Sequence, residues 1–479
     1  MYLNTFSWPK KLNDMKNSLN HIALALGLFA STQLAAHAGD DVKMLLELLL
    51  EKGVITQDEF DQKLKLAREK EEIRAFNEAQ DIRRANREID KRAEDERKFK
   101  TQIYGQLSAG YYQASNMSSA NLDASGMSDQ PKGNNRAGLK VSRELNADNT
   151  VMVTLESNFS ARTGAIGRDA AGYGTANNNT PGATLLDREA NIRWISKEYG
   201  TFILGRGPTL QNDLSGAFDA RQNWNFGGLK PIGRYIGSHS ANGVNRADKL
   251  FRYISPNWNG FNLDTGVSFG GVPGNDERGT NYYLGGRYKN GNFELGYNHA
   301  EVRLGGSSPA NTPTSQQAVN NRVDFLAAKY SMEQLTLNTG FIMTRNPSTA
   351  SGGSFNTFVT NGRVNANTWF AGAVYRFTPT ISWNLGYYAV DDRTVQTSTN
   401  KNNDVQMLAT GLTYTPYKDW DFFIDYATAR RQAGATGAFT IYDKWGPDTG
   451  TPCASSTGTG CSESKSSQTG VSVGAQYKF

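Results

Sequence analysis

The chain has 479 residues, enough for two or three ordinary domains, with 38% hydrophobic residues, 49 glycines and a net charge of +5. After residue 40 it contains no run of about 20 apolar residues, which excludes a helical membrane protein. A polar average does not exclude a membrane β-barrel, because only alternate residues of such a barrel face lipid. The modest positive charge does not by itself indicate nucleic acid, and we expect no such partner.

The first 38 residues have the pattern of a secretory signal peptide. Lys16 supplies the positive start, Ile22 to Ala30 form a short apolar run, and Ala36-His37-Ala38 has the small-x-small spacing of a cleavage site. We take Met15 as the start and Gly39 as the first residue of an exported chain. The alternative interpretation is a buried helix of a soluble domain.

Residues 39–100 are predicted to be helical. An apolar helix from Val42 to Lys52 is capped by Gly53, and Thr56-Gln57-Asp58-Glu59 forms a capping box that begins a second helix. Residues 61–100 carry 24 charged side chains and cannot bury a core of their own. A broken apolar stripe on this second helix favours a short coiled coil in the periplasm, and the alternative is a single exposed helix.

After Thr101 the sequence alternates between polar and apolar residues in segments separated by turns. We count sixteen predicted strands, beginning near residues 102, 135, 150, 186, 201, 248, 261, 280, 293, 321, 335, 367, 381, 403, 421 and 469. Short connections such as 146–149, 198–200 and 290–292 alternate with long polar ones such as 161–185 and 207–247. An even number of strands with short turns at one end and long loops at the other is typical of an outer-membrane β-barrel over residues 101–479.

The segment Gly470 to Phe479 is a strand with one apolar and one polar face. A closed barrel requires this strand to pair with the first one, residues 102–112, so that no edge is left in the membrane. Phe479 is then expected at the periplasmic aromatic girdle. The alternative, a soluble β-sandwich, conflicts with the leader and with the alternation of loop lengths.

Several segments, in order and at matching spacing, resemble the Gram-negative general porins, in particular the trimeric sixteen-stranded porins of β-proteobacteria. They are "IYGQLSAGYY", "NRAGLKVSREL", "VMVTLESNFSARTG", "LDREANIRWISKEYGTFILGR", "RADKLFRYISPNWNGF" and the closing "YKF". The helices before the barrel resemble the coiled-coil extensions of some phosphate- or dicarboxylate-type porins. The resemblance implies a homotrimer whose third long loop folds into the lumen and narrows it.

In this family, basic residues of the barrel wall face acidic residues of the third loop across a constriction. The resemblance assigns the wall positions to Arg136, Arg188 and Arg246, whereas a lysine of some porins is replaced by Gln106. Arg206 matches an arginine near the subunit interface. Arg188 shares a strand face with apolar Ala190, Ile192 and Trp194, so its inward orientation requires a subunit interface that reverses the usual rule.

On the third loop the first family acid matches Asp219, and the second position is occupied by Asn225. Arg221, Lys230 and Arg234 add positive charge to the same loop. Three wall arginines opposite a loop that has lost an acid imply a preference for anions.

The sequence shows no pattern of reaction chemistry, and we expect neither enzymatic activity nor a cofactor or metal. Cys453 and Cys461 lie in a Ser/Thr/Gly-rich stretch of an exported chain, so we expect a disulfide, with two free thiols as the alternative.

The predicted function is passive diffusion of small hydrophilic solutes and ions, anionic or neutral, through an outer-membrane channel surrounded by lipid. Two alternatives remain: a substrate-specific channel, and a structural anchor whose coiled coil reaches the cell wall or a periplasmic partner.

Overall fold

The computed structural model describes residues 42–97, 99–116, 123–162, 164, 166, 185–222, 224–235, 244–270, 280–304, 319–346, 364–393, 404–431, 441 and 467–479. The predicted signal peptide, Cys453 and Cys461 lie outside these residues. Contacts divide the chain into two units, Met1–Arg97 and Lys98–Phe479.

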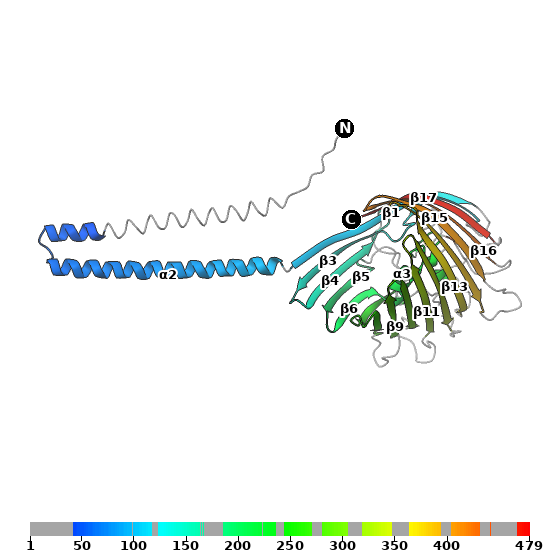
Figure 1. Cartoon of the computed structure of the whole chain (residues 1–479), viewed down its shortest axis with the longest axis horizontal. Coiled ribbons are helices and arrows are strands. Elements are labelled where there is room, and N and C mark those ends of the chain that lie inside the picture. The colour runs from blue at the N-terminus through cyan, green and yellow to red at the C-terminus, as the bar shows by residue number, and fades with distance from the viewer. Residues whose placement is uncertain are drawn as a thin grey trace, which may run out of the picture. The chain divides into compact units, whose positions relative to one another are not determined.

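The described part of the first unit is helical (Figure 1). Residues 42–51 form one helix, Gly53 takes the left-handed conformation at φ 67°, and α2 (Gln57–Arg97) follows. The predicted capping box is present: the Thr56 N–H donates to Glu59 Oε2 at 2.9 Å, and the Glu59 N–H donates to Thr56 Oγ1 at 3.3 Å. Among the described residues, no helix combines the length and the apolar character needed to cross a bilayer.

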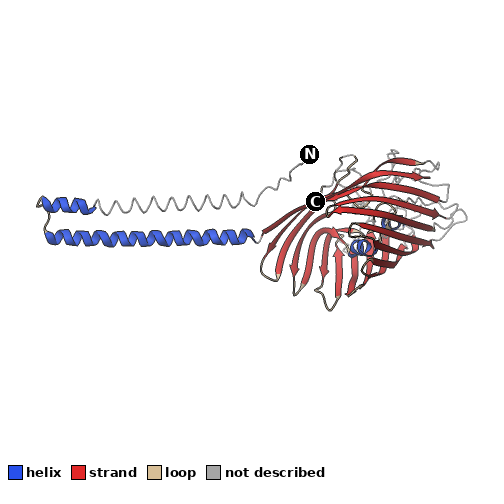
Figure 2. Ribbon diagram, turned by 45° about the horizontal axis from the view of Figure 1, so that its top comes forward, coloured by secondary structure: helices blue, strands red, loops and turns tan. Residues whose placement is uncertain are grey.

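The second unit is a closed antiparallel β-barrel with two short helices (Figures 1 and 2). Its elements are β1 (Phe99–Ser115), β2 (Ala124–Asp129), β3 (Arg136–Glu144), β4 (Asn149–Asn158), β5 (Glu189–Ser196), β6 (Gly200–Pro208), α3 (Leu210–Phe218), α4 (Leu229–Tyr235), β7 (Arg246–Ile254), β8 (Phe261–Ser268), β9 (Asn281–Asn290), β10 (Phe293–Leu304), β11 (Val319–Ser331), β12 (Leu335–Asn346), β13 (Val364–Arg376), β14 (Ile381–Asp392), β15 (Val405–Tyr417), β16 (Trp420–Arg431) and β17 (Ser467–Lys478).

Sixteen positions make up the barrel wall, because β2 and β3 share one of them. Both pair with the same edge of β1, β3 with its first half and β2 with its second half. Residues 130–135, between β2 and β3, leave the wall, and we call them the inner turn. The sixteen predicted strands are thus confirmed, whereas the interruption by the inner turn was not predicted.

The barrel closes where β17 meets β1. Gln106 is opposite Lys478, the register continues to Ser115 opposite Thr469, and Gly105 and Phe479 exchange backbone hydrogen bonds of 2.9 and 3.1 Å. The predicted pairing of the first and last strands is therefore confirmed, and it satisfies backbone groups that would be costly to leave unpaired in lipid.

Side chains alternate between the two faces of the wall, as a membrane barrel requires. On β15, Leu408 and Leu412 are 40% and 45% exposed on the outer face, whereas Met407 and Ala409 are fully buried on the inner face. Large apolar side chains occupy the outer face around the barrel, and this apolar belt faces the lipid.

Candidate functional site

The third loop, residues 209–245, folds into the barrel between β6 and β7. Its two ends are tied together at the neck, where the Thr209 N–H donates to the Asn245 carbonyl at 3.1 Å and the Thr209 hydroxyl donates to the Val244 carbonyl. The same hydroxyl caps α3 by accepting from the Asn212 N–H at 3.5 Å. The helix then runs along the inner face of β9 to β12.

Apolar packing fixes the third loop against this wall. Leu210, Leu214 and Phe218 of α3 are at most 1% exposed. Glycines of the wall make room for them: a Cβ on Gly285 would lie 2.6 Å from Leu210, and one on Gly296 would lie 2.6 Å from Leu214. Burying each large side chain contributes about 1.5–3 kcal/mol, so this half of the inner wall is packed against the third loop.

Asp219 and Arg221, both predicted constriction residues, are buried in this packed half. Asp219 is 3% exposed: it accepts a hydrogen bond from the Tyr388 hydroxyl at 2.6 Å and another from the Leu229 N–H at 2.9 Å. Arg221 is fully buried and pairs with Asp425 of β16 at 2.9 Å. The structure thus uses both residues to anchor the third loop to the wall, and neither side chain faces open lumen.

The inner turn holds the far end of the third loop. The backbone N–H groups of Asn225 and Phe226 donate to the Pro131 carbonyl at 3.1 and 3.2 Å, and Asn225 Nδ2 donates to the Gln130 carbonyl at 2.5 Å. Lys230 donates to Asn134 Oδ1. Asn225 and Lys230 are therefore buried contacts between the two segments, and the side chain of Arg234 lies outside the described residues.

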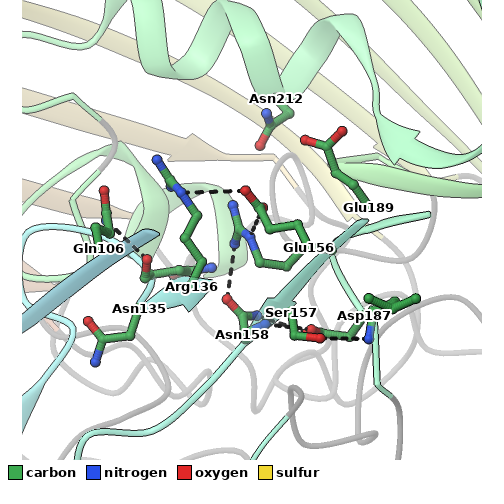
Figure 3. A network of polar contacts seen from close by, with 12 residues as sticks. Gln106, Asn135, Arg136, Glu156, Ser157, Asn158, Asp187, Glu189 and Asn212 are labelled. Atoms are coloured by element: carbon green, nitrogen blue, oxygen red, sulfur yellow. Dashed lines mark hydrogen bonds and ion pairs between the residues drawn. The ribbon is translucent and has the colours of Figure 1, made fainter. Parts of the chain in front are cut away.

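The three predicted wall arginines are brought together around one carboxylate, Glu156 of β4. Arg188 Nε contacts Glu156 Oε1. Arg136 Nε lies 3.6 Å from Glu156 Oε2 (Figure 3). Arg188 also donates to Asn158 Oδ1 at 3.1 Å. Arg246, at the start of β7, interacts electrostatically with both Glu156 and Arg188. We call Arg136, Arg188 and Arg246 the basic wall.

The orientation of Arg188 needs no reversed lipid-facing rule. Strand β5 begins at Glu189, so Arg188 belongs to the preceding turn and is not bound by strand alternation. Its backbone N–H donates to the Glu156 carbonyl at 3.2 Å, which directs the side chain to the same carboxylate. The predicted start of this strand, near residue 186, is a few residues too early, and the expectation that Arg188 shares a strand face with Ala190 depends on that boundary.

Glu156 was missed by the sequence analysis, although the sequence carries a signal for it. In "VMVTLESN", Thr154, Glu156 and Asn158 occupy every second position, and the apolar Val151, Val153 and Leu155 lie on the opposite face. This places the three polar residues on the inner face next to the strand of Arg136. The Tyr104 hydroxyl donates to Glu156 Oε2 at 2.9 Å, so the carboxylate is fully engaged.

Gln106 and Arg206, the two other residues matched through the family resemblance, both have partners in the barrel wall or the inner turn. Gln106 Nε2 donates to the Asn134 carbonyl of the inner turn at 3.0 Å, so Gln106 supports this turn. Arg206 is paired with Asp248 at 2.5 Å and donates to the Asp187 carbonyl at 2.6 Å.

The third loop contributes no unpaired carboxylate to the lumen. Between residues 209 and 245 the sequence has two acids, Asp213 and Asp219, and Asp219 is buried. Asp213 pairs with Arg252 of β7 at 2.7 Å. Burial would raise the pKa of Asp213, but the charge and the hydrogen bond of Arg252 hold this pKa below its usual value, so the group stays ionised and neutralised.

A closed sixteen-stranded barrel with an apolar outer belt, short turns at one end and a loop folded into its lumen defines the class of outer-membrane channel proteins. The sequence profile of the Gram-negative porins matches residues 79–434, and the chain belongs to this family. It is therefore a porin of the Gram-negative outer membrane, as the resemblance in the sequence predicted.

Solved structures agree on the fold. The anion-selective porin from Comamonas acidovorans superposes with a TM-score of 0.59 at 17% identity, covering 80% of this chain and 100% of that one. OmpF of Salmonella typhi, in complex with daunomycin, superposes with a TM-score of 0.51 at 15% identity, covering 80% of this chain and 98% of that one. In-vitro folded OmpT of Vibrio cholerae superposes with a TM-score of 0.51 at 14% identity, covering 80% of this chain and 98% of that one. The comparison with curated proteins returned no match.

Proposed function

We propose that the barrel forms a water-filled channel for passive diffusion of small hydrophilic solutes and ions, with a preference for anions. The observation that carries the proposal is the charge balance between the two sides of the lumen. The basic wall gathers three guanidinium groups around the single carboxylate of Glu156, while both acids of the third loop are neutralised or buried.

This arrangement differs from a constriction with opposed charges. Where acids face bases, the field across the pore is strong but the net charge is small. Here Glu156 cancels about one of the three positive charges, and the remainder raises the local concentration of anions. Glu189, at the start of β5, lowers this excess only in part, because Arg193 pairs with it.

The channel is proposed to be a homotrimer with α2 in the periplasm. One of the OmpT structures with the same fold is described as a trimer form. Leu66, Ile73 and Phe76 lie on one face of α2, and each is more than 50% exposed in the single chain. Packing of three such helices would cover these side chains, which supports the coiled coil predicted from the sequence.

The test is the zero-current potential of the purified full-length protein in a planar bilayer between unequal potassium chloride solutions. In a channel that prefers anions, the zero-current potential has the same sign as the equilibrium potential of chloride. A sealed barrel would instead support the structural-anchor alternative. A current that saturates with one solute would support the substrate-specific channel.

A further inference from the structure

One residue of the third loop, Gly216, lacks a side chain for no reason that the fold supplies. It lies within α3 and does not take the left-handed backbone conformation that favours glycine. A Cβ built on Gly216 would meet no other group within 4 Å, so the space beside it is open. Glycine inside a helix also destabilises the helix relative to alanine. Neither backbone conformation nor packing therefore requires a glycine at this position.

Two other glycines of the third loop, Gly227 and Gly228, are different. Gly227 has φ 64°, and a Cβ on it would lie 2.7 Å from the Ala409 side chain. A Cβ on Gly228 would lie 2.5 Å from the Trp224 carbonyl oxygen. Both glycines are thus needed where the loop packs closely against the wall or against itself, whereas Gly216 has open space beside it.

The open space beside Gly216 belongs to the lumen. Leu214 is buried against the wall, and Gly216, two residues later, lies about 200° around the helix axis from it. Gly216 is exposed and shares the free face of α3 with Asn212, one turn earlier. Figure 3 shows the Asn212 side chain pointing from α3 toward the side of the lumen that holds Glu156 and Glu189. The free face of α3 is therefore turned toward the basic wall.

This free face contributes little bulk and no free charge to the lumen. Asn212 carries a short amide that donates to its neighbour Asp213 at 3.2 Å, and Asp213 pairs with Arg252 of β7. On the basic wall, Arg136 keeps 34% of its side chain exposed. A permeating ion therefore passes between an exposed guanidinium group and a helix face whose backbone is bare at Gly216.

We propose that Gly216 sets the size limit of the channel, because the missing side chain widens the passage between α3 and the basic wall. The inference rests on the proposed diffusion function, since a solute is excluded by size only where it passes through the lumen. Any side chain at residue 216 would extend into the passage and reduce its cross-section. Large organic anions would be excluded first, because a narrower pore of the same charge still admits small ions. The glycine thus extends the permeant class from inorganic anions to organic ones.

The experiment measures the permeability of gluconate relative to chloride, from zero-current potentials of the full-length protein between potassium chloride and potassium gluconate. The wild type is compared with Gly216→Ala, Gly216→Leu and Gly216→Trp. We expect the ratio to fall in this order, with most of the gluconate current lost in Gly216→Trp while chloride current remains. Gly216→Ala should unfold at the same or a higher temperature than the wild type, because alanine favours the helix.

A second pair of variants tests whether residue 216 faces the basic wall. Gly216→Asn and Gly216→Asp add side chains of nearly equal size, and only the aspartate adds a charge. A charge about 5 Å from the path of the ions changes the permeability ratio of anions to cations about four-fold at physiological salt. Gly216→Asp should therefore lower this ratio about four-fold relative to Gly216→Asn.

The matched control is Ala147→Trp, which adds the same bulky side chain to the exposed short turn between β3 and β4. It should keep the gluconate ratio of the wild type. A wild type that carries no current would overturn the diffusion function and this inference with it. A conducting wild type whose gluconate ratio is unchanged in Gly216→Leu and Gly216→Trp would overturn the size limit alone. A lower unfolding temperature in Gly216→Ala would also overturn it, because the glycine would then have a structural role.

Discussion

Replacing Arg136 and Arg246 by alanine is the most direct test of the basic wall. We expect the zero-current potential in a salt gradient to move toward cation preference, because the two changes remove two positive charges beside the path of the ions. Arg188 is left in place, since its contacts with Glu156 and Asn158 also hold the turn before β5.

The size of the shift follows from distances and screening. A chloride ion about 5 Å from a guanidinium group in water gains about 0.8 kcal/mol. With a Debye length of about 8 Å, screening leaves about 0.4 kcal/mol, which enriches anions and depletes cations about two-fold each. Each unpaired arginine therefore changes the permeability ratio about four-fold. Arg136 Nε lies 3.6 Å from Glu156 Oε2, and this carboxylate offsets part of the arginine's charge, so Arg136 contributes less than about four-fold. The double variant should therefore change the permeability ratio of anions to cations by roughly five- to ten-fold.

The assay is the zero-current potential in planar bilayers, measured for the wild type, the double variant and a control at identical salt. Arg376→Ala is the control, because this arginine is exposed at the short-turn end of β13. Lys329 is a poor control, since its Nζ lies 3.5 Å from the Ala217 carbonyl at the end of α3. A cation-selective wild type, or equal shifts from the control and the double variant, would refute the reasoning.

Four further predictions concern the third loop and the helical unit. Arg221→Met leaves Asp425 buried without its partner and should cost about 3–5 kcal/mol, measured as a lower unfolding temperature in detergent, whereas recovery in Arg221→Met/Asp425→Leu would show that the buried charge causes the loss. An aspartate at residue 225 has no amide group to donate to the Gln130 carbonyl, so Asn225→Asp should lower the unfolding temperature more than Asn225→Ala does. An Asn225→Asp variant that keeps its stability but changes ion selectivity would instead show that residue 225 faces the lumen. Hydrogen bonds from the Thr56 N–H and hydroxyl hold the pKa of Glu59 below its usual value of about 4.3, so the cap is complete above that pH and is lost as the pH falls through the lowered pKa. Amide exchange at residues 57–60, corrected for intrinsic rates, should therefore speed up between pH 7 and pH 3 in the wild type and not in Glu59→Gln. Deleting residues 39–98 should leave a barrel that inserts but is less stable as a trimer, and light scattering that finds the full-length protein monomeric would contradict this.

The wall of the barrel could be predicted from the sequence because its determinants are local. Alternation along residues such as Val471 to Tyr477 specifies which side chains face lipid, and short turns such as 290–292 specify where a strand ends. The pairing of β1 with β17 then follows from closure, because a membrane barrel cannot leave an edge unpaired.

The interior was harder to predict because its contacts join distant parts of the chain. Asp219 has the sequence position of a constriction acid, yet Tyr388 of β14 holds it in the packed half of the lumen. The inner turn has ordinary turn residues, and no local pattern indicates that it binds Asn225. The three wall arginines could be predicted through the family resemblance. Glu156 could be predicted from the sequence alone, because the alternation along β4 places it on the inner face near the end of the strand.

The seam between β1 and β17 also sets the order in which the barrel can assemble. Its partners are separated by more than 350 residues along the chain, as Ser115 and Thr469 show, so every hairpin between them can form before the seam does. Pairings between distant residues bear the largest entropic cost of loop closure and form late. Until the seam forms, β1 and β17 each present an unpaired edge, and these edges are the point at which an assembly factor could hold the unfinished barrel.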